Sequence, residues 1–148
     1  MSRIPGSSAQ TPSYPMPQIA RELAVGTDIV EIGRVATLVE RYRERFTHRV
    51  FTAGELADCQ GRPESLAARW AAKEAVAKAL GTGIGPMCFN EIEVLQDGCG
   101  RPDLRLHGSA EMLARELGLD CWAISLAHDG GMALAFVVAS KATPLSQR

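Results

Sequence analysis

Hydrophobic and polar residues alternate in some stretches of the chain and recur at helical spacing in others. The alternation predicts strands over residues 23–32, 91–96, 103–107, 121–127 and 132–140. The helical spacing predicts helices over residues 35–47, 64–80 and 109–117, and a second short helix is predicted within residues 50–59. Strands and helices do not alternate strictly along the chain. The pattern therefore predicts an α+β domain in which a largely antiparallel sheet packs against the long helix.

Residues at the predicted helix ends agree with these boundaries. Thr52 and Glu55 have the spacing of a capping box, in which each side chain binds the other's backbone amide. Pro63 suits the first turn of the long helix, and Gly81 suits its C-terminal stop. Ser109 is the predicted N-cap of the last helix.

The two ends of the chain differ from the rest in composition. Residues 1–18 contain four of the eight prolines, mixed with Ser, Thr and Gln. Such a segment buries too little apolar surface to offset its ordering entropy, so residues 1–20 are predicted to be a disordered tail. Met16 is a candidate start of the chain. The domain is predicted to cover residues 21–141, followed by a short tail at 142–148.

Composition and charge limit the class of protein. A chain of 148 residues fits one domain with one core. Its net charge of −1 argues against a general nucleic-acid binder. No apolar run approaches the roughly 20 residues that span a membrane, and no signal peptide is recognisable, so a cytoplasmic location is predicted. No zinc-like spacing links the four cysteines, Cys59, Cys88, Cys99 and Cys121.

Asp28 is the least expected residue of the first predicted strand. Alternation places it on one face with Ala24, Gly26, Val30 and Ile32. Asp is disfavoured in strands and is rarely buried without a partner. The sequence leaves two explanations equally open: Asp28 binds nearby backbone amides or an arginine, or it binds a cation.

The predicted long helix is rich in alanine and confines its polar residues to a few positions. Trp70, Glu74 and Lys78 follow each other at four-residue spacing and form a ridge, while Arg69 and Lys73 lie beside it. Glu74 and Lys78 suit a surface ion pair. Three cations around one carboxylate also suit a site for a phosphate and a metal.

Three further stretches carry candidate chemistry. The Gly-rich loop 81–86 follows a helix and lacks a Gly-Lys-Ser/Thr sequence, so it is a weak nucleotide motif and either ends the helix or lines a cofactor pocket. Residues 34–49 contain five arginines against two glutamates, which fits either a solvated helix face or a docking surface for an acidic partner. His128 and Asp129 lie at a predicted Gly-rich turn, where a base or phosphate contact is one interpretation and a structural role the other.

These segments together resemble the holo-acyl-carrier-protein synthase family, the small 4′-phosphopantetheinyl transferases. The matching motifs are Val-Gly-Thr-Asp-Ile-Val-Glu-Ile at 25–32, Phe-Thr-x-x-Glu at 51–55, Leu-Ala-Ala-Arg-Trp-Ala-Ala-Lys-Glu-Ala at 66–75, Lys-Ala-Leu-Gly at 78–81, Gly-Arg-Pro at 100–102 and Ser-x-x-His-Asp at 125–129. Their order and spacing match over about residues 23–140, and the tail is not covered. The resemblance implies the 4′-phosphopantetheinyl transferase fold.

The resemblance also implies an activity: transfer of 4′-phosphopantetheine from coenzyme A to a serine of apo acyl carrier protein, releasing adenosine 3′,5′-bisphosphate. Asp28 and Glu74 match the carboxylates that hold Mg²⁺. The implied coenzyme A contacts are Arg69, Lys73, Lys78, Gly81, Gly83 and His128. The implied carrier surface includes Arg34, Arg41 and Arg45. Family members of this type form homotrimers with sites between subunits.

Some questions stay open on the sequence. Glu74, or a water beside it, is the first candidate for the base that takes the serine proton, and Asp129 or His128 is the second. The turn after Asp129 carries Met132 where many members have a bulkier polar or aromatic residue. Competing hypotheses are a trimer that binds coenzyme A or a carrier without turnover, and a phosphatase or phosphoryl transferase acting on a nucleotide.

Overall fold

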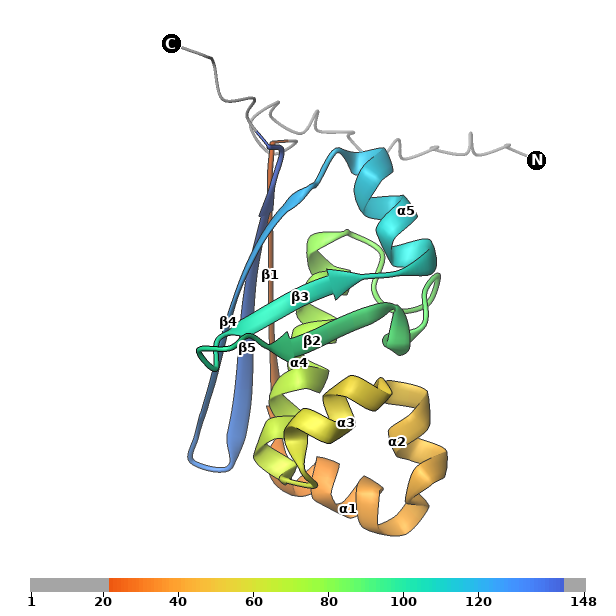
Figure 1. Cartoon of the computed structure of the whole chain (residues 1–148), viewed down its shortest axis with the longest axis vertical. Coiled ribbons are helices and arrows are strands. Elements are labelled where there is room, and N and C mark those ends of the chain that lie inside the picture. The colour runs from red at the N-terminus through yellow and green to blue at the C-terminus, as the bar shows by residue number, and fades with distance from the viewer. Residues whose placement is uncertain (1–21, 143–148) are drawn as a thin grey trace, which may run out of the picture.

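The structure is a computed structural model that describes residues 22–142 (Figure 1). Its elements in chain order are β1 (Leu23–Glu31), α1 (Ile32–Tyr42), α2 (Glu44–Val50), α3 (Ala53–Cys59), α4 (Pro63–Ala79), the short 3₁₀ helix η2 (Phe89–Glu91), β2 (Ile92–Gln96), β3 (Pro102–Leu106), α5 (Gly108–Leu117), β4 (Cys121–Asp129) and β5 (Met132–Ser140). The predicted disordered tail and Met16 lie outside the described residues, as does all but the first residue of the predicted C-terminal tail.

Two antiparallel sheets form the β part of the domain. The larger has the strand order β1-β5-β4, and the smaller is the hairpin β2-β3. Asp28 of β1 lies opposite Ala135 of β5, which lies opposite Leu126 of β4. Figure 1 shows the three long strands on one side of the molecule, with α4 and the remaining elements on the other. The predicted α+β class with an antiparallel sheet against the long helix is confirmed.

Small side chains let α4 lie directly against the sheet. Ala71, Ala72 and Ala75 are fully buried and belong to the core between α4 and the strands. Gly26 of β1 faces the same helix, and a Cβ atom added there would lie 1.8 Å from the Ala75 carbonyl oxygen. Helix and strand therefore meet backbone to backbone, two residues before Asp28 on β1 and one residue after Glu74 on α4.

A second cluster of buried side chains holds α1, α2 and α3 against the first half of α4. Val35, Val50 and Phe51 pack there with Cys59 and Leu66. Burial, despite the opposing effect of nearby Arg69, raises the pKa of the Cys59 thiol to about 11. This cluster fixes the end of the molecule where α1 and α2 lie (Figure 1).

The structure corrects three local predictions. The helix predicted over 35–47 is two helices, α1 and α2, because Arg43 adopts a positive φ of 46°. Ser109 caps no helix: His107 is the N-cap of α5, and the Ser109 hydroxyl donates to Glu91 instead. Strand β4 extends to Asp129, so a two-residue turn remains, in which Gly130 and Gly131 both have the positive φ of a tight hairpin.

The outer face of the large sheet is apolar, and none of residues 22–142 covers it. Leu23, Val25 and Ile29 of β1 are about half exposed, and Leu134 and Phe136 of β5 are exposed by 40% and 43%. A contiguous apolar sheet face of this kind marks a surface for association. Within residues 22–142 we find no helix with the length and apolar character needed to span a bilayer.

Candidate active site

Asp28 and Glu74 line one cavity between β1 and α4. Its volume is about 300 Å³, and its wall is made by Asp28, Ile29, Val30, Glu31, Arg34, Trp70 and Glu74. The carboxylates come from elements distant in sequence, and the close approach at Gly26 brings these elements together. The structure thus gathers the two residues predicted to hold a metal.

Lys78 provides the ionic partner of Asp28. Its ammonium lies 2.9 Å from Asp28 Oδ1 and donates to the Thr27 carbonyl at 3.0 Å. The Lys78 side chain is 54% exposed and that of Asp28 is 18% exposed, so the pair lies open to solvent. The surface ion pair considered for Glu74 and Lys78 is replaced by this one.

Glu74 is half-buried on α4, one turn from Trp70 and one turn from Lys78. Within the described residues, no three His, Cys, Asp or Glu side chains gather closely enough to hold a metal ion by themselves. Two carboxylates on one open cavity fit Mg²⁺, which commonly takes one or two carboxylates and completes its shell with substrate phosphates and water. The donor set therefore suits a metal that arrives with a phosphate-bearing substrate.

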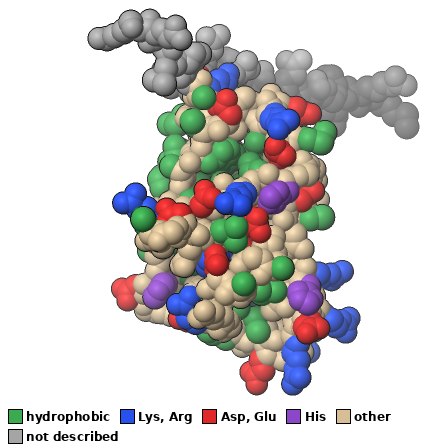
Figure 2. Space-filling view, viewed as in Figure 1, with side chains coloured by type: hydrophobic (Ala, Val, Ile, Leu, Met, Phe, Trp, Pro, Cys, Tyr) green, Lys and Arg blue, Asp and Glu red, His purple; other side chains and the backbone are tan. Residues whose placement is uncertain are grey.

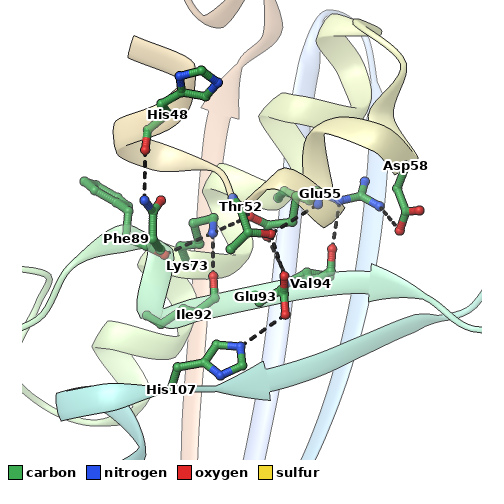
Figure 3. A network of polar contacts seen from close by, with 12 residues as sticks. His48, Thr52, Glu55, Asp58, Lys73, Phe89, Ile92, Glu93, Val94 and His107 are labelled. Carbon is green, nitrogen blue, oxygen red and sulfur yellow. Dashed lines mark hydrogen bonds and ion pairs between the residues drawn. The ribbon is translucent and has the colours of Figure 1, made fainter. Parts of the chain in front are cut away.

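Lys73 is fully buried and points toward Glu55 and Ile92 in the domain interior (Figure 3). It is not part of the cavity wall. Its ammonium uses all three donors: it binds Glu55 Oε2 at 2.8 Å, the Phe89 carbonyl at 3.0 Å and the Ile92 carbonyl. Neither Lys73 nor Glu55 has any exposed side-chain surface. The structure does not agree with the coenzyme A contact predicted for Lys73, because no N–H donor remains for a ligand. Lys73 instead has a structural role.

Glu55 was predicted only as part of a capping box, but in the structure its carboxylate also binds Lys73 and the Val94 amide. One carboxylate oxygen accepts from the Thr52 amide as the capping box predicts, and the other accepts from the Val94 amide at 2.8 Å. Burial lowers the pKa of Lys73, and the Glu55 carboxylate opposes that shift. The sequence carried no clear signal of this internal pair: Glu55 lies beside Leu56, but Lys73 is followed directly by another charged residue, Glu74.

Arg69 is also buried, with 4% of its surface exposed. Its Nε donates to the Val94 carbonyl at 2.9 Å, and its guanidinium lies 3.7 Å from Asp58. These contacts tie α4 to β2 and α3. The position of Arg69 thus does not support the predicted phosphate contact, because the side chain is buried and binds Val94 and Asp58.

The other predicted coenzyme A residues lie apart from the cavity. Gly81 and Gly83 follow α4 with φ of 80° and 65°, and their amides donate to carbonyls of the last helical turn. His128 and Asp129 are exposed at the end of β4, which β5 separates from β1. Within one chain, His128 and Asp129 are therefore not brought together with Asp28 and Glu74.

The predicted carrier surface forms one end of the molecule. Arg34 and Arg41 lie on α1, and Arg45 lies on α2. Arg34 lines the cavity of Asp28 and Glu74, whereas Arg45 lines a neighbouring hollow of about 270 Å³ with Leu38, Tyr42, Phe46 and Arg49. Figure 2 shows Lys and Arg side chains gathered at the end where Figure 1 places α1 and α2. The basic surface thus adjoins the cavity.

Curated sequence relatives cover nearly the whole described domain. A holo-[acyl-carrier-protein] synthase of Herpetosiphon aurantiacus is 50% identical over 123 residues, which is 78% of this chain and 97% of the relative. A protein of the same name from Chloroflexus aurantiacus is 49% identical over 130 residues, covering 77% of this chain and 95% of its own length.

Solved structures agree with the sequence relatives. The holo-[acyl-carrier-protein] synthase of Helicobacter pylori, solved in complex with coenzyme A, matches with a TM-score of 0.72 and 32% identity, over 78% of this chain and 99% of that one. The enzyme of Neisseria meningitidis matches with a TM-score of 0.70 and 38% identity, over 80% and 98%. Residues 24–137 fit the sequence profile of one family, so the chain belongs to the 4′-phosphopantetheinyl transferase superfamily.

Proposed function

We propose that this protein is a holo-acyl-carrier-protein synthase, which transfers 4′-phosphopantetheine from coenzyme A to a serine hydroxyl of an apo acyl carrier protein. The observation that carries the proposal is the shared cavity of Asp28 and Glu74, flanked by Lys78 on one side and by Arg34 on the other. In a member of this superfamily, that arrangement combines a metal-and-phosphate site with the edge of a basic docking surface.

Asp28 and Glu74 are the residues that would hold Mg²⁺, together with the pyrophosphate of coenzyme A. When bound, the ion supplies positive charge that stabilises the charge developing on the departing adenosine 3′,5′-bisphosphate. Lys78, held at the cavity by Asp28 and the Thr27 carbonyl, would bind a phosphate oxygen of coenzyme A. Its exposure leaves donor capacity for that contact.

The serine proton needs an acceptor beside the reacting phosphate. Glu74 is our first candidate because its carboxylate lines the cavity and has no ion-pair partner among the described residues. His128 and Asp129 are the second candidates, and in that role they would come from another subunit.

The exposed apolar face of the β1-β5-β4 sheet supports a homotrimer. Isolated domains rarely leave that many large apolar side chains uncovered, and a neighbouring subunit would bury them. The separation of His128 from Asp28 within one chain adds support, because assembly would then complete the site. Static light scattering measures the mass: a monomer at micromolar concentration would contradict this part of the proposal.

Arg34, Arg41 and Arg45 would meet acidic residues of the carrier protein. Complementary charge speeds such encounters and weakens with salt. We therefore expect the KM for the carrier to rise with salt concentration more steeply than the KM for coenzyme A.

The direct test is the mass of the carrier protein. The full chain is incubated with coenzyme A, Mg²⁺ and a panel of purified apo carrier proteins, and each carrier is weighed by mass spectrometry. A phosphopantetheine addition on the carrier serine, absent without coenzyme A or with a chelator, is the expected result. Binding of coenzyme A without any mass addition would favour a non-catalytic binder, and release of inorganic phosphate would indicate a phosphatase.

A further inference from the structure

Trp70 lies where the cavity of Asp28 and Glu74 meets the basic surface. Its side chain is part of the cavity wall, one helical turn before Glu74. On the same indole, the guanidinium carbon of Arg34 lies 5.7 Å from the ring centroid, within the range of a cation–π contact. A single side chain therefore contacts both the candidate metal cavity and the first arginine of the candidate docking surface.

The indole is held in place by two other aromatic rings. Phe46 of α2 lies 5.4 Å away at a tilt of 52°, and Phe89 of η2 lies 6.2 Å away, nearly perpendicular. A hydrogen bond of 2.8 Å from Asn90 to the His48 carbonyl joins η2 to α2 beside this stack. Because Trp70 touches residues of α1, α2 and η2, its ring is a fixed platform rather than a free surface side chain.

We propose that Trp70 is a positioning residue that holds the Arg34 guanidinium at the cavity edge, ready to pair with an acidic side chain of the incoming carrier protein. This inference rests on the proposed function. An arginine that is already ordered loses less conformational freedom when its partner binds. The arrangement would also fix the distance between the docking contact and the carboxylates, so that the carrier serine arrives beside the reacting phosphate.

Arg41 provides a matched comparison. Its guanidinium lies 5.2 Å from the ring centroid of Tyr42, its neighbour on α1, and neither residue lines the cavity. Arg41 would contribute charge to the same surface without any link to Trp70. A variant at Arg41 thus separates loss of positive charge from loss of the platform.

The first expected result concerns the kinetic constants of Trp70→Leu. We expect its KM for the carrier to rise about three- to fivefold, the range given by loss of one exposed cation–π contact. The KM for coenzyme A should rise less than the KM for the carrier, and kcat should fall as well, because a loosely held Arg34 places the carrier serine less accurately. Trp70→Phe keeps an aromatic face and should lie between the wild type and Trp70→Leu. A purely structural role would lower the folded fraction and hence the apparent kcat, without changing the KM for the carrier.

The deciding experiment is a pair of double-mutant cycles on the KM for the carrier. Arg34→Ala with Trp70→Leu should be no worse than Arg34→Ala alone, because the platform has no function without its arginine. Arg41→Ala with Trp70→Leu should show the product of the two single effects. The inference would be wrong if the effects of Trp70→Leu and Arg34→Ala on the KM for the carrier also multiplied. It would also be wrong if Trp70→Leu raised the KM for coenzyme A instead.

The same double-mutant cycles can be measured on the Kd for the apo carrier in the absence of coenzyme A. This measurement separates the inference about Trp70 from the proposed function. Wild-type protein that binds the carrier but adds no phosphopantetheine refutes the transferase proposal, while the Kd cycle still decides the role of Trp70. Wild type that transfers the group but shows independent effects refutes the Trp70 inference alone. A wild type that neither binds nor modifies any carrier overturns both.

Discussion

Helix α4 carries two lysines, five residues apart, that each bind one carboxylate in very different surroundings. Lys73 binds Glu55 at 2.8 Å with no exposed surface on either side chain. Lys78 binds Asp28 at 2.9 Å with 54% and 18% of the side chains exposed. A five-residue step turns the helix by about 140°, so one lysine faces the β2 side of the core and the other faces solvent beside β1.

The difference lies in the remaining partners. Every donor of Lys73 and both oxygens of Glu55 are occupied within the chain, which a buried charge pair requires if its desolvation is to be offset. Lys78 and Asp28 keep contact with solvent and adjoin a cavity that Glu74 also lines. Similar distances therefore describe a closed structural bond in one case and a pair open to a ligand in the other.

The largest expected effect comes from breaking the closed pair. Lys73→Met leaves the Glu55 carboxylate buried without its cation, and we expect the free energy of unfolding to fall by about 3–5 kcal/mol. Lys78→Met is the matched control, and its exposed pair should cost at most about 1 kcal/mol. Urea denaturation measures both. Equal losses for the two variants would show that the pairs do not differ as described.

The carboxylates of the open cavity should matter for activity rather than stability. We expect Asp28→Asn and Glu74→Gln each to lower the rate of phosphopantetheine transfer by about 10²–10³-fold, the typical loss when one electrostatic contact to a transition state is removed. Their urea midpoints should stay close to the wild-type value. Full transfer activity in both variants, measured by carrier mass over time, would refute the metal assignment.

The close approach that forms the cavity can be tested at Gly26. Gly26→Ala places a Cβ against the Ala75 carbonyl, so strand and helix must separate. Overpacking of this kind costs about 1–3 kcal/mol, and it should also move Asp28 away from Glu74 and reduce transfer. Gly33→Ala is the control, since its nearest neighbour would be the Glu31 carboxylate at 3.7 Å, an ordinary contact. A Gly26→Ala variant as stable and active as Gly33→Ala would contradict this account.

The smallest expected effect is the contribution of Glu93, which binds Thr52 and His107, to stability in acid. Desolvation opposes the shift, but hydrogen bonds from Thr52 and His107 lower the pKa of Glu93 below its usual 4.5. A carboxyl with a lower pKa in the folded state adds stability above pH 4.5 and loses it as the pH falls through the folded value. Urea midpoints between pH 6 and 3.5 should therefore fall less steeply in Glu93→Gln than in wild type. Parallel curves would assign the acid sensitivity to other groups.

Local signals in the sequence were sufficient for most elements. The capping box of Thr52 and Glu55, Pro63 at the start of α4 and the alternation of β1 and β5 all act within a few residues, and these elements are found where the pattern places them. The break at Arg43 was missed because a positive φ is uncommon at an arginine and no Gly or Pro marks the position in the sequence.

The sequence by itself determined the α+β class and the alanine-rich helix, because periodicity runs along the chain, and its motifs predicted Asp28 and Glu74 as the metal-binding pair. Only the tertiary structure decided which cation pairs with which carboxylate: Lys73 with Glu55, and Lys78 with Asp28. Nothing in the sequence separated the charged residues of α4 by burial, yet Arg69 and Lys73 are buried in the core while Glu74 and Lys78 lie at the cavity. The reason is that burial depends on what packs against each side of a helix, and the two strands beside α4 are distant in sequence: β1 precedes the helix and β2 follows it.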